Sequence, residues 1–294
     1  MPHFATVANI LVTGAGGQLG RQIMHRARDL SSADTVVGRT SGELDITDGA
    51  AVADAIAPGT VVVNCAAHTA VDAAETEEAR AYAINADGPR NLAEACARVN
   101  ARLIHVSTDY IFDGTGQIPY EPEDVPAPRS AYGRTKLAGE KAVLQALPTA
   151  TIVRTAWVYT GTGSDFVSTM RRLERERETV SVVDDQTGSP TYARDLAGGL
   201  LELATSAETS ESILHLTNSG TATWFELARA VFAGIGADPA RVLPCTSADF
   251  VRPAPRPAYS VLSAASWERA GLSPLRDWRE ALDDALAATG TATT

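Results

Sequence analysis

The sequence has few cysteines, no long apolar run and no excess of basic residues. Its three cysteines, Cys65, Cys96 and Cys245, are odd in number and far apart, so a disulfide framework is not expected. No close grouping of Cys and His suggests a structural metal. No apolar stretch approaches the ~20 residues of a membrane-spanning helix, and residues 1–9 lack the pattern of a signal peptide. These absences together predict a cytoplasmic protein.

Basic residues are also in deficit. There are 25 of them against 36 acidic residues, which gives a formal charge of −11 and a pI near 4.9. So negative a chain is a poor partner for nucleic acid or an anionic membrane surface, and neither is expected. Any phosphate-bearing ligand must therefore be held by backbone amides or by a few local cations. Lysine is especially scarce, because only Lys136 and Lys141 occur, against twenty-three arginines.

Strands and helices are predicted to alternate along the first half of the 294 residues. Short β-type runs occur at residues 10–13, 35–37, 60–64, 102–107 and 151–154. The segments 18–30, 77–99 and 130–147 between them are helical in character. This alternation predicts an α/β fold, with a doubly wound parallel sheet of the Rossmann type that helices cover on both faces.

The pattern loosens after about Trp157. A charged stretch at 170–178 is typical of a solvated helix face, and further helices are expected at 223–235 and 274–288. Turn-rich segments separate them, among them DDQTGSPT and the proline-rich RPAPRP, and the terminal TGTATT is typical of a frayed end. We expect residues 1–157 to form mainly the sheet domain. Residues 158–294 then form mainly a smaller C-terminal lobe that closes over the carboxyl edge of the sheet, with some chain returning to the sheet.

A glycine-rich turn, GAGGQLG at residues 14–20, follows the first predicted strand. Gly14, Gly17 and Gly20 permit a tight turn, close approach of the backbone to a pyrophosphate, and close packing of the next helix. The amide groups at the start of that helix, at Gln18 and Leu19, would attract phosphates. A merely flexible turn is the alternative, but the position between strand and helix favours a dinucleotide site. No GxxxxGK sequence is present, which disfavours a nucleoside triphosphatase.

Arg39 follows the second predicted strand, where a dehydrogenase selects the ribose of its cofactor. An arginine at this position can pair with a 2′-phosphate, which favours NADPH over NADH. A plain surface arginine is an equally good interpretation of one residue, so NADH stays open as a cofactor.

Tyr132 and Lys136 are four residues apart in the helical stretch that begins after Ser130, a suitable N-cap. The spacing puts both side chains on one face of the helix. A phenol has a pKa near ~10, and a neighbouring ammonium is expected to lower that pKa, which would make Tyr132 a usable general acid or base. An incidental surface pair is the alternative. The scarcity of lysine favours the catalytic interpretation, because this chain otherwise uses arginine for its cations.

The fourth predicted strand ends in Ser107 and Thr108, at the carboxyl edge of the sheet. A hydroxyl there can hydrogen-bond the same substrate oxygen that Tyr132 protonates. Both residues have the right chemistry, and spacing does not choose between them. A hydroxyl that only satisfies the local backbone is the alternative.

These motifs together resemble the extended short-chain dehydrogenase/reductases and, more narrowly, their dTDP-4-dehydrorhamnose reductase family. The resemblance covers nearly the entire chain, and the blocks that carry it are LVTGAGGQLG, LDITD, NCAAHTAVDAAE, STDYIFDG, YGRTKLAGE, VRTAWVYTG, VVDDQTGSPTYARDLA and RPAPRPAYSVLS. The first and fifth blocks mark only the superfamily, whereas the last two are far more specific. The resemblance implies an NADPH-dependent reduction of the C4 ketone of a dTDP-linked 6-deoxy sugar.

The resemblance also implies roles for individual residues. It favours Thr108 over Ser107 and so gives a catalytic set of Thr108, Tyr132 and Lys136. It places Asp45 and Ile46 at the adenine end of the cofactor, and it places Cys65, Ala66 and Ala67 beside the cofactor. The positions that it implies for the sugar nucleotide are Thr69, Val71, Thr108, Tyr110 and Trp157. Core packing is the alternative for Trp157, and no independent chemical argument supports a role for the Cys65 thiol or for His68.

One position departs from the family pattern. Some members form a dimer bridged by Mg²⁺ through glutamates, one of them just beyond the glycine turn, where this chain has Gln22. A neutral amide is a poor ligand for a hard cation. We therefore expect a monomer or a weak homodimer without a magnesium bridge, and no metal in the chemistry. Three rival functions stay open: a 4-ketoreductase for another dTDP-deoxysugar, an epimerase that retains NAD, and a non-catalytic regulatory partner of methionine adenosyltransferase.

Overall fold

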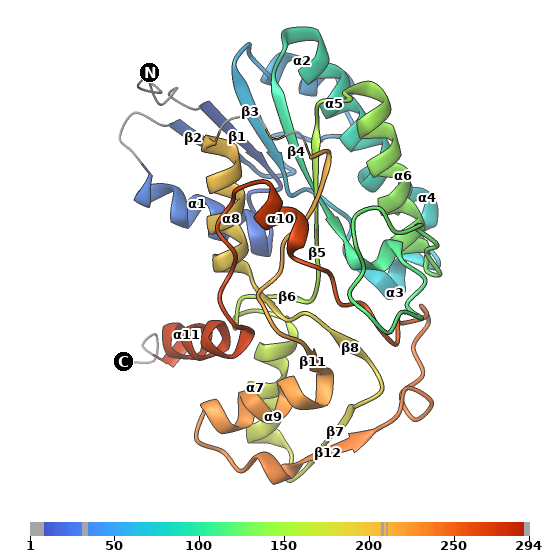
Figure 1. Cartoon of the computed structure of the whole chain (residues 1–294), viewed down its shortest axis with the longest axis vertical. Helices are drawn as coiled ribbons and strands as arrows, with labels where there is room; N and C mark the ends of the chain where they lie inside the picture. The colour runs from blue at the N-terminus through green and yellow to red at the C-terminus, as the bar shows by residue number, and fades with distance from the viewer. Residues whose placement is uncertain (1–8, 31–34, 207–208, 210, 291–294) are drawn as a thin grey trace.

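A six-stranded parallel sheet forms the upper half of the molecule (Figure 1), in a computed structural model that describes residues 9–30, 35–206, 209 and 211–290. Its strands, in spatial order, are β10 (Ile213–His215), β5 (Thr151–Thr155), β4 (Arg102–Thr108), β3 (Thr60–Asn64), β1 (Asn9–Thr13) and β2 (Thr35–Arg39). All five residues of β3 are buried, as expected for a strand covered on both faces. The predicted α/β fold with a parallel, Rossmann-type sheet is confirmed.

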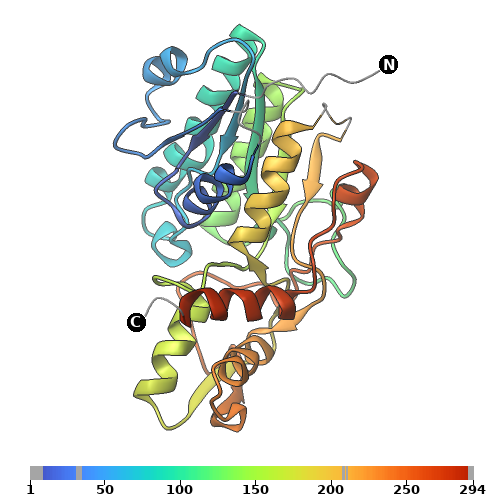
Figure 2. The ribbon, with the colours of Figure 1, turned by 90° about the vertical axis from the view of Figure 1, so that its left-hand side faces the viewer.

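Helices cover both faces of this sheet (Figure 2). On one face, α1 (Gln18–Arg26) and α8 (Ala193–Thr205) pack side by side, and their apolar residues share a core with the sheet. The other face is covered by α2 (Gly49–Ala55), α5 (Gly88–Val99) and α6 (Ala131–Ala146). Each helix buries an apolar stripe against the sheet, and this burial is the main force that holds the layers together.

The strand order reverses at β1. The chain runs from β1 to β2 on one side and then crosses to β3 on the other, so the connections after β1 and β3 leave in opposite directions. The end of β1 and the segment after β3 are joined by a hydrogen bond from the Cys65 N–H to the Thr13 carbonyl at 3.1 Å. Ligands of open α/β sheets bind in the crevice at such a reversal.

A smaller body lies below the carboxyl edge of the sheet (Figure 1). It is built from α7 (Phe166–Glu176), α9 (Trp224–Gly234), α11 (Trp278–Gly290) and the parallel pair β7 (Val180–Val183) and β12 (Val242–Cys245). These elements share a second apolar core that includes Phe232 and Trp278. Two short pairs connect the two bodies: β6 (Val158–Tyr159) with β9 (Thr191–Tyr192), and β8 (Thr187–Gly188) with β11 (Ala222–Thr223). Of the terminal TGTATT, Thr289 and Gly290 belong to α11, and residues 291–294 lie outside the described residues.

Several elements differ from the sequence-based expectation. The helix predicted at 77–99 is divided into α4 (Glu78–Tyr82), a π-helical turn (Ala83–Asp87) and α5, and a short α3 (Val71–Ala74) precedes it. The helix predicted to reach residue 30 ends at Arg26 and continues as a 3₁₀ turn. Helices α2, α8 and α10 (Ala265–Arg269) and strand β10 were not predicted. Among the described residues, no helix is both long and apolar enough to cross a membrane.

Candidate active site

A cavity of about 710 Å³ opens at the carboxyl edge of the sheet, between the sheet and the lower body. It collects side chains from the glycine turn, from the ends of β3, β4 and β5, from α6 and from α9. The predicted site residues that line it are Gly17, Gln18, Leu19, Gly20, Cys65, Ala67, Thr69, Val71, Thr108, Tyr110, Tyr132, Lys136 and Trp157. All three residues of the predicted catalytic set therefore face one space, together with the glycine turn.

The glycine turn has the close backbone packing that a phosphate cradle requires. Gly14 has a φ of +68°, and a Cβ atom there would lie 2.6 Å from the Ala66 nitrogen. A Cβ atom on Gly20 would collide with the Gly14 carbonyl oxygen. The N-cap of α1 is Gly17, and no side chain in the described part of the chain caps this helix. The first amide groups of α1 therefore remain available to an anion in the cavity, which fits the diphosphate of a dinucleotide.

Five predicted cofactor residues do not line the cavity. Gly14 and Ala66 shape its wall through the backbone contact just described. Arg39 is exposed at the end of β2, where its carbonyl accepts the Ala15 N–H at 3.0 Å. Asp45 accepts two hydrogen bonds from Thr47, through the N–H at 2.9 Å and the hydroxyl at 2.8 Å. Ile46 is buried in the core against Gly88. The cofactor roles of these five residues stay predictions.

Tyr132 and Lys136 enter the cavity from the first two turns of α6. The helix begins after Ser130, whose hydroxyl accepts the Gly133 N–H at 3.1 Å, so the predicted N-cap is confirmed. A Cβ atom on Gly133 would collide with the Tyr110 carbonyl, so this glycine lets α6 approach the end of β4 closely. The ring of Tyr110 packs edge-on against that of Tyr132, with centroids 5.6 Å apart. These contacts fix the phenol at the mouth of the sheet.

The ionisation of this pair differs from the expectation. Burial raises the pKa of Tyr132 to about 12, partly offset by a hydrogen bond from the Thr108 side chain. Burial likewise lowers the pKa of Lys136 to about 8. The Lys136 ammonium donates to the Val106 carbonyl at 2.7 Å. The expected lowering of the phenol pKa is not found in this structure, because desolvation of the buried phenol raises its pKa and Lys136 is not among the groups that shift it. At neutral pH the phenol of Tyr132 holds its proton.

Thr108 sits at the junction of β4 and the following turn. Its hydroxyl donates to Asp109 Oδ1 at 3.0 Å and accepts the Tyr110 N–H at 3.2 Å. The neighbouring Ser107 hydroxyl is buried and has no hydrogen-bond partner among the described residues. Because Thr108 also contacts the Tyr132 phenol, the geometry favours Thr108 over Ser107. Burial raises the pKa of the Asp109 carboxyl to about 6. The sequence indicated neither that the Asp109 side chain lines the cavity nor that it is buried.

Two stacked tryptophans form the lower wall of the cavity. Trp157 has a φ of +45°, and its indole stacks on that of Trp224 with ring centroids 3.5 Å apart and planes 6° apart. A Cβ atom on Gly188 would overlap the Trp157 ring, so only glycine fits there. Trp157 is half-buried and faces the cavity, so core packing does not account for it alone. Trp224 and the neighbouring Phe166 also line the cavity, and no sequence motif indicated either residue.

The proline-rich run returns to the rim of the cavity. Arg256 pairs with Asp72 on α3 at 2.9 Å, and Arg252 approaches the same carboxylate at 3.4 Å. The Ala254 N–H also donates to it at 3.2 Å. Asp72 follows Val71, which lines the cavity. The run therefore ties the lower body to the segment after β3, across 182 residues of sequence.

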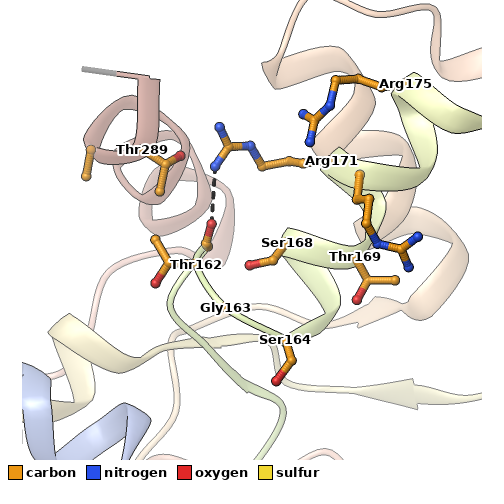
Figure 3. Close-up of a pocket in the computed structure, with 11 residues that line it drawn as sticks. Thr162, Gly163, Ser164, Ser168, Thr169, Arg171, Arg175 and Thr289 are labelled. Atoms are coloured by element: carbon orange, nitrogen blue, oxygen red, sulfur yellow. Dashed lines mark hydrogen bonds between the residues drawn. The ribbon is translucent and has the colours of Figure 1, made fainter. Parts of the chain in front are cut away.

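A second cavity, of about 540 Å³, lies beside the first and shares Ser164 with it (Figure 3). Arginines on α7 line one side, and the loop before α7 lines the other. Arg171 donates to the Gly161 carbonyl at 3.2 Å, which fixes the loop that leads to Asp165. None of the predicted site residues faces this space. In the described part of the chain, no group of three or more acidic, Cys or His side chains is arranged to hold a metal ion.

Comparison with known proteins agrees with this geometry. Residues 8–290 match the family model described as the RmlD substrate binding domain. The chain belongs to this family. A dTDP-4-dehydrorhamnose reductase from Mycobacterium tuberculosis is 56% identical over 289 residues, which are 97% of this chain and 94% of that protein. The resemblance drawn from the sequence motifs is thereby confirmed.

Two further relatives of this chain bear on the site. The crystal structure of a dTDP-4-dehydrorhamnose reductase from Bacillus anthracis in complex with NADP superposes with a TM-score of 0.90. It is 36% identical and covers 96% of this chain and 100% of that one. A Streptomyces antibioticus protein named as a probable dTDP-4,6-dihydroxy-2-methyloxan-3-one 4-ketoreductase is 51% identical, over 94% of each chain. The relatives of this chain are therefore named for different keto sugars.

Proposed function

We propose that the chain reduces the C4 ketone of dTDP-4-dehydro-β-L-rhamnose to dTDP-L-rhamnose with NADPH, and that Tyr132 donates the proton. One observation carries the proposal: Thr108, Tyr132 and Lys136 face the same cavity as the uncapped N-terminus of α1. A dinucleotide on that turn and a ketone beside the phenol would share one space. The names of the M. tuberculosis and B. anthracis relatives support the same substrate.

The chain's own residues supply proton delivery and positioning. Because burial raises the pKa of Tyr132 to about 12, its hydroxyl is protonated at neutral pH and serves as an O–H donor to the developing alkoxide. The Thr108 hydroxyl lies next to it, and its single proton, which is donated to Asp109 Oδ1 in this structure, would turn to the same substrate oxygen. Lys136 places a positive charge at the base of the site, which favours the phenolate left after the transfer. General acid catalysis of this kind typically contributes ~10²–10⁴-fold.

The cofactor would be held by residues that follow β1 and β3, on the two sides of the reversal in strand order, and by Lys136. The first amides of α1 would bind its diphosphate, Cys65 to Ala67 would run beside it, and Lys136 would hold its nicotinamide ribose. When bound, the reduced nicotinamide supplies the hydride. The NADP complex of the B. anthracis relative supports NADP(H) as the dinucleotide. We assign the preference for NADPH over NADH to Arg39 at the end of β2, and we place Asp45 and Ile46 at the adenine end.

The sugar nucleotide would occupy the opposite side of the cavity, against Thr69, Val71, Tyr110 and Trp157. These residues come from the segments after β3, β4 and β5, so the sugar would lie across the carboxyl edge of the sheet. The ion pair between Arg256 and Asp72 closes this side.

A 4-ketoreductase for another dTDP-deoxysugar is the second candidate, and the S. antibioticus relative favours it. Because the two candidates share the same chemistry at Tyr132, they differ only in the sugar that the cavity accepts. An epimerase would consume no cofactor overall, and a purely regulatory subunit would need none of the three catalytic residues.

The decisive experiment is an assay of the purified chain with dTDP-4-dehydro-L-rhamnose and either NADPH or NADH, with identification of the product sugar. We expect one NADPH oxidised for each dTDP-L-rhamnose formed. A Tyr132→Phe variant should bind cofactor normally and lose about 10²–10⁴-fold in kcat. Product without net NADPH oxidation would overturn the proposal in favour of an epimerase. Turnover of only a different keto sugar would favour the second candidate.

A further inference from the structure

A buried chain of hydrogen bonds lies directly beneath the site, between β1, β3 and β4. Asn64 Oδ1 accepts the Thr13 hydroxyl at 2.7 Å and the Ala66 N–H at 3.0 Å. Its Nδ2 lies 2.8 Å from His105 Nδ1. The other ring nitrogen, His105 Nε2, lies 3.5 Å from Lys136 Nζ. All four side chains, those of Thr13, Asn64, His105 and Lys136, are at most 2% exposed, so no solvent competes for these contacts.

The chain fixes the tautomer of His105. A backbone N–H can only donate, so the Ala66 amide identifies its partner on Asn64 as the oxygen. The Asn64 NH₂ group must then face His105, and since it too can only donate, His105 Nδ1 must accept. Burial and the Lys136 charge hold the pKa of His105 well below its usual range, so the ring is neutral. Its single proton therefore sits on Nε2, the nitrogen that faces Lys136.

This tautomer conflicts with a protonated lysine. An ammonium has three N–H groups and no lone pair, so it cannot accept a hydrogen bond from the His105 Nε2–H. One of its protons is used by the Val106 carbonyl at 2.7 Å. Only a neutral amine at Lys136 could accept from the ring and donate to Val106 at the same time. A charged Lys136 therefore has a hydrogen-bond acceptor at Val106 but none at His105.

We propose that His105 is a positioning residue for Lys136, and that Asn64 fixes the tautomer of His105 so that its Nε2–H denies the ammonium a second acceptor on the sheet besides the Val106 carbonyl. The consequence rests on the proposed function: an ammonium that finds an acceptor at Val106 but none at His105 keeps its remaining N–H groups for the phenol of Tyr132 and the cofactor in the cavity. His105 touches neither, and it acts only through Lys136.

The other ionisable groups around Lys136 do not reproduce this effect. The Cys65 thiol after β3 faces it, but burial raises the pKa of that thiol to about 12, so it carries no charge at neutral pH. Glu140, one turn further along α6, favours the ammonium but is bound by Arg154 at 2.8 Å. Of these three neighbours, only His105 presents an N–H donor to the Lys136 ammonium.

Nuclear magnetic resonance tests the proposal on the unmodified chain without substrate or cofactor. The ¹⁵N shifts of His105 report which ring nitrogen holds the proton. Because the chain has only two lysines, ¹³Cε labelling gives two signals, and exposed Lys141 on the same helix is an internal reference. We expect the His105 proton on Nε2. We also expect the pH titration of the Lys136 ¹³Cε signal to have a midpoint well below that of Lys141. An Nδ1–H ring, a charged ring or equal midpoints would overturn the proposal.

Asn64→Asp reverses the tautomer by design. One carboxylate oxygen keeps the bonds from Thr13 and Ala66, while the other accepts from His105 and so moves the ring proton to Nδ1. The Nε2 lone pair then accepts from Lys136, and the titration midpoint of Lys136 should rise by about one to three pH units. Thr13→Val is the matched control, because the Ala66 N–H still orients the amide and both signals should stay unchanged. A raised midpoint with an unchanged tautomer would mean that the added charge acts alone and would overturn the proposal. Since no turnover is measured, failure of the proposed reductase activity would leave this result intact.

Discussion

Thr108 donates its hydroxyl proton to the buried carboxylate of Asp109 across 3.0 Å, directly beside the phenol of Tyr132. Asp109, which orients this hydroxyl, is itself destabilised in its charged form by burial, and burial raises its pKa to about 6. The site combines a neutral phenol, an oriented hydroxyl and a carboxylate close to its titration range. Each has consequences that can be measured.

Asp109→Asn should stabilise the fold at alkaline pH. Because burial raises the pKa of Asp109 to about 6, the folded state binds a proton more tightly than the unfolded chain. This contribution to stability is complete below about pH 4 and is lost as the pH rises through about 6. At pH 8 the variant should therefore gain about 1–3 kcal/mol in urea unfolding, and near pH 4 the gain should vanish. A gain that does not change with pH would contradict the assignment.

Asp113→Asn provides a control of opposite sign. Hydrogen bonds from Thr115 lower the pKa of Asp113 to about 2, so its charge favours the folded state at neutral pH. This contribution is present above the unfolded pKa and is lost as the pH falls toward about 2. The substitution should destabilise the protein at pH 8 and have less effect in acid.

Lys136→Arg should impair turnover although it keeps the charge. Lys136 is 2% exposed and packs between the Val106 carbonyl and His105, and the longer, planar guanidinium cannot reproduce the position of the ammonium beside Tyr132. A displacement of this kind can cost about 10²-fold in kcat. Lys141→Arg on the exposed face of the same helix should retain activity. Equal kcat values for the two variants would remove the argument from the scarcity of lysine.

Arg39→Ala should change the choice of cofactor. An exposed arginine at the end of β2 that pairs with a 2′-phosphate contributes only when NADPH is bound. We expect the KM for NADPH to rise about 10-fold or more while the KM for NADH is unchanged. Steady-state kinetics with each cofactor measure this difference. If the two KM values change together, Arg39 is a plain surface residue.

Glu140→Gln should destabilise the fold by about 3–5 kcal/mol, because it leaves the Arg154 guanidinium buried without its anion. The two side chains form a double hydrogen bond, at 3.0 and 2.8 Å, and both are almost fully buried. Combining this change with Arg154→Met should recover part of the loss in a double-mutant cycle. Glu176→Gln, in the exposed pair with Arg172, is the control and should stay within about 0.5 kcal/mol of wild type.

Magnesium should not assemble this chain. Gln22 lies half-buried on α1, where relatives with a bridged dimer are expected to carry a glutamate. Sedimentation with and without Mg²⁺ should give the same molecular mass. Gln22→Glu tests the reason, because restoring a carboxylate supplies an oxygen ligand that a hard cation prefers. Mass that increases with Mg²⁺ in the unmodified chain would contradict the prediction.

Much of the sheet follows from the sequence because its strands are short, apolar and bounded by turns. The three valines of β3 predict a strand that is buried on both faces, and residues 60–64 form it as expected. The i, i+4 spacing likewise predicts that Tyr132 and Lys136 share a face. Local patterns of this kind determine local structure, so no tertiary information is needed to find them.

The remaining elements depend on contacts that are remote in sequence. Strand β10 has only three residues and becomes a strand through its pairing with β5, 61 residues earlier. The π-helical turn is held by Asn85, which bonds the backbone of His68 and the hydroxyl of Thr135. The ionisation of Tyr132 depends on how completely the fold buries it, and residue spacing does not encode burial.

The stacked indoles of Trp157 and Trp224 make the cavity accessible to intrinsic tryptophan fluorescence. The two other tryptophans, Trp267 and Trp278, are buried in apolar clusters and do not line the cavity. Only the stacked pair borders the space that a ligand would enter. A change in intrinsic tryptophan fluorescence should therefore report ligand binding in the cavity without any dye, label or turnover.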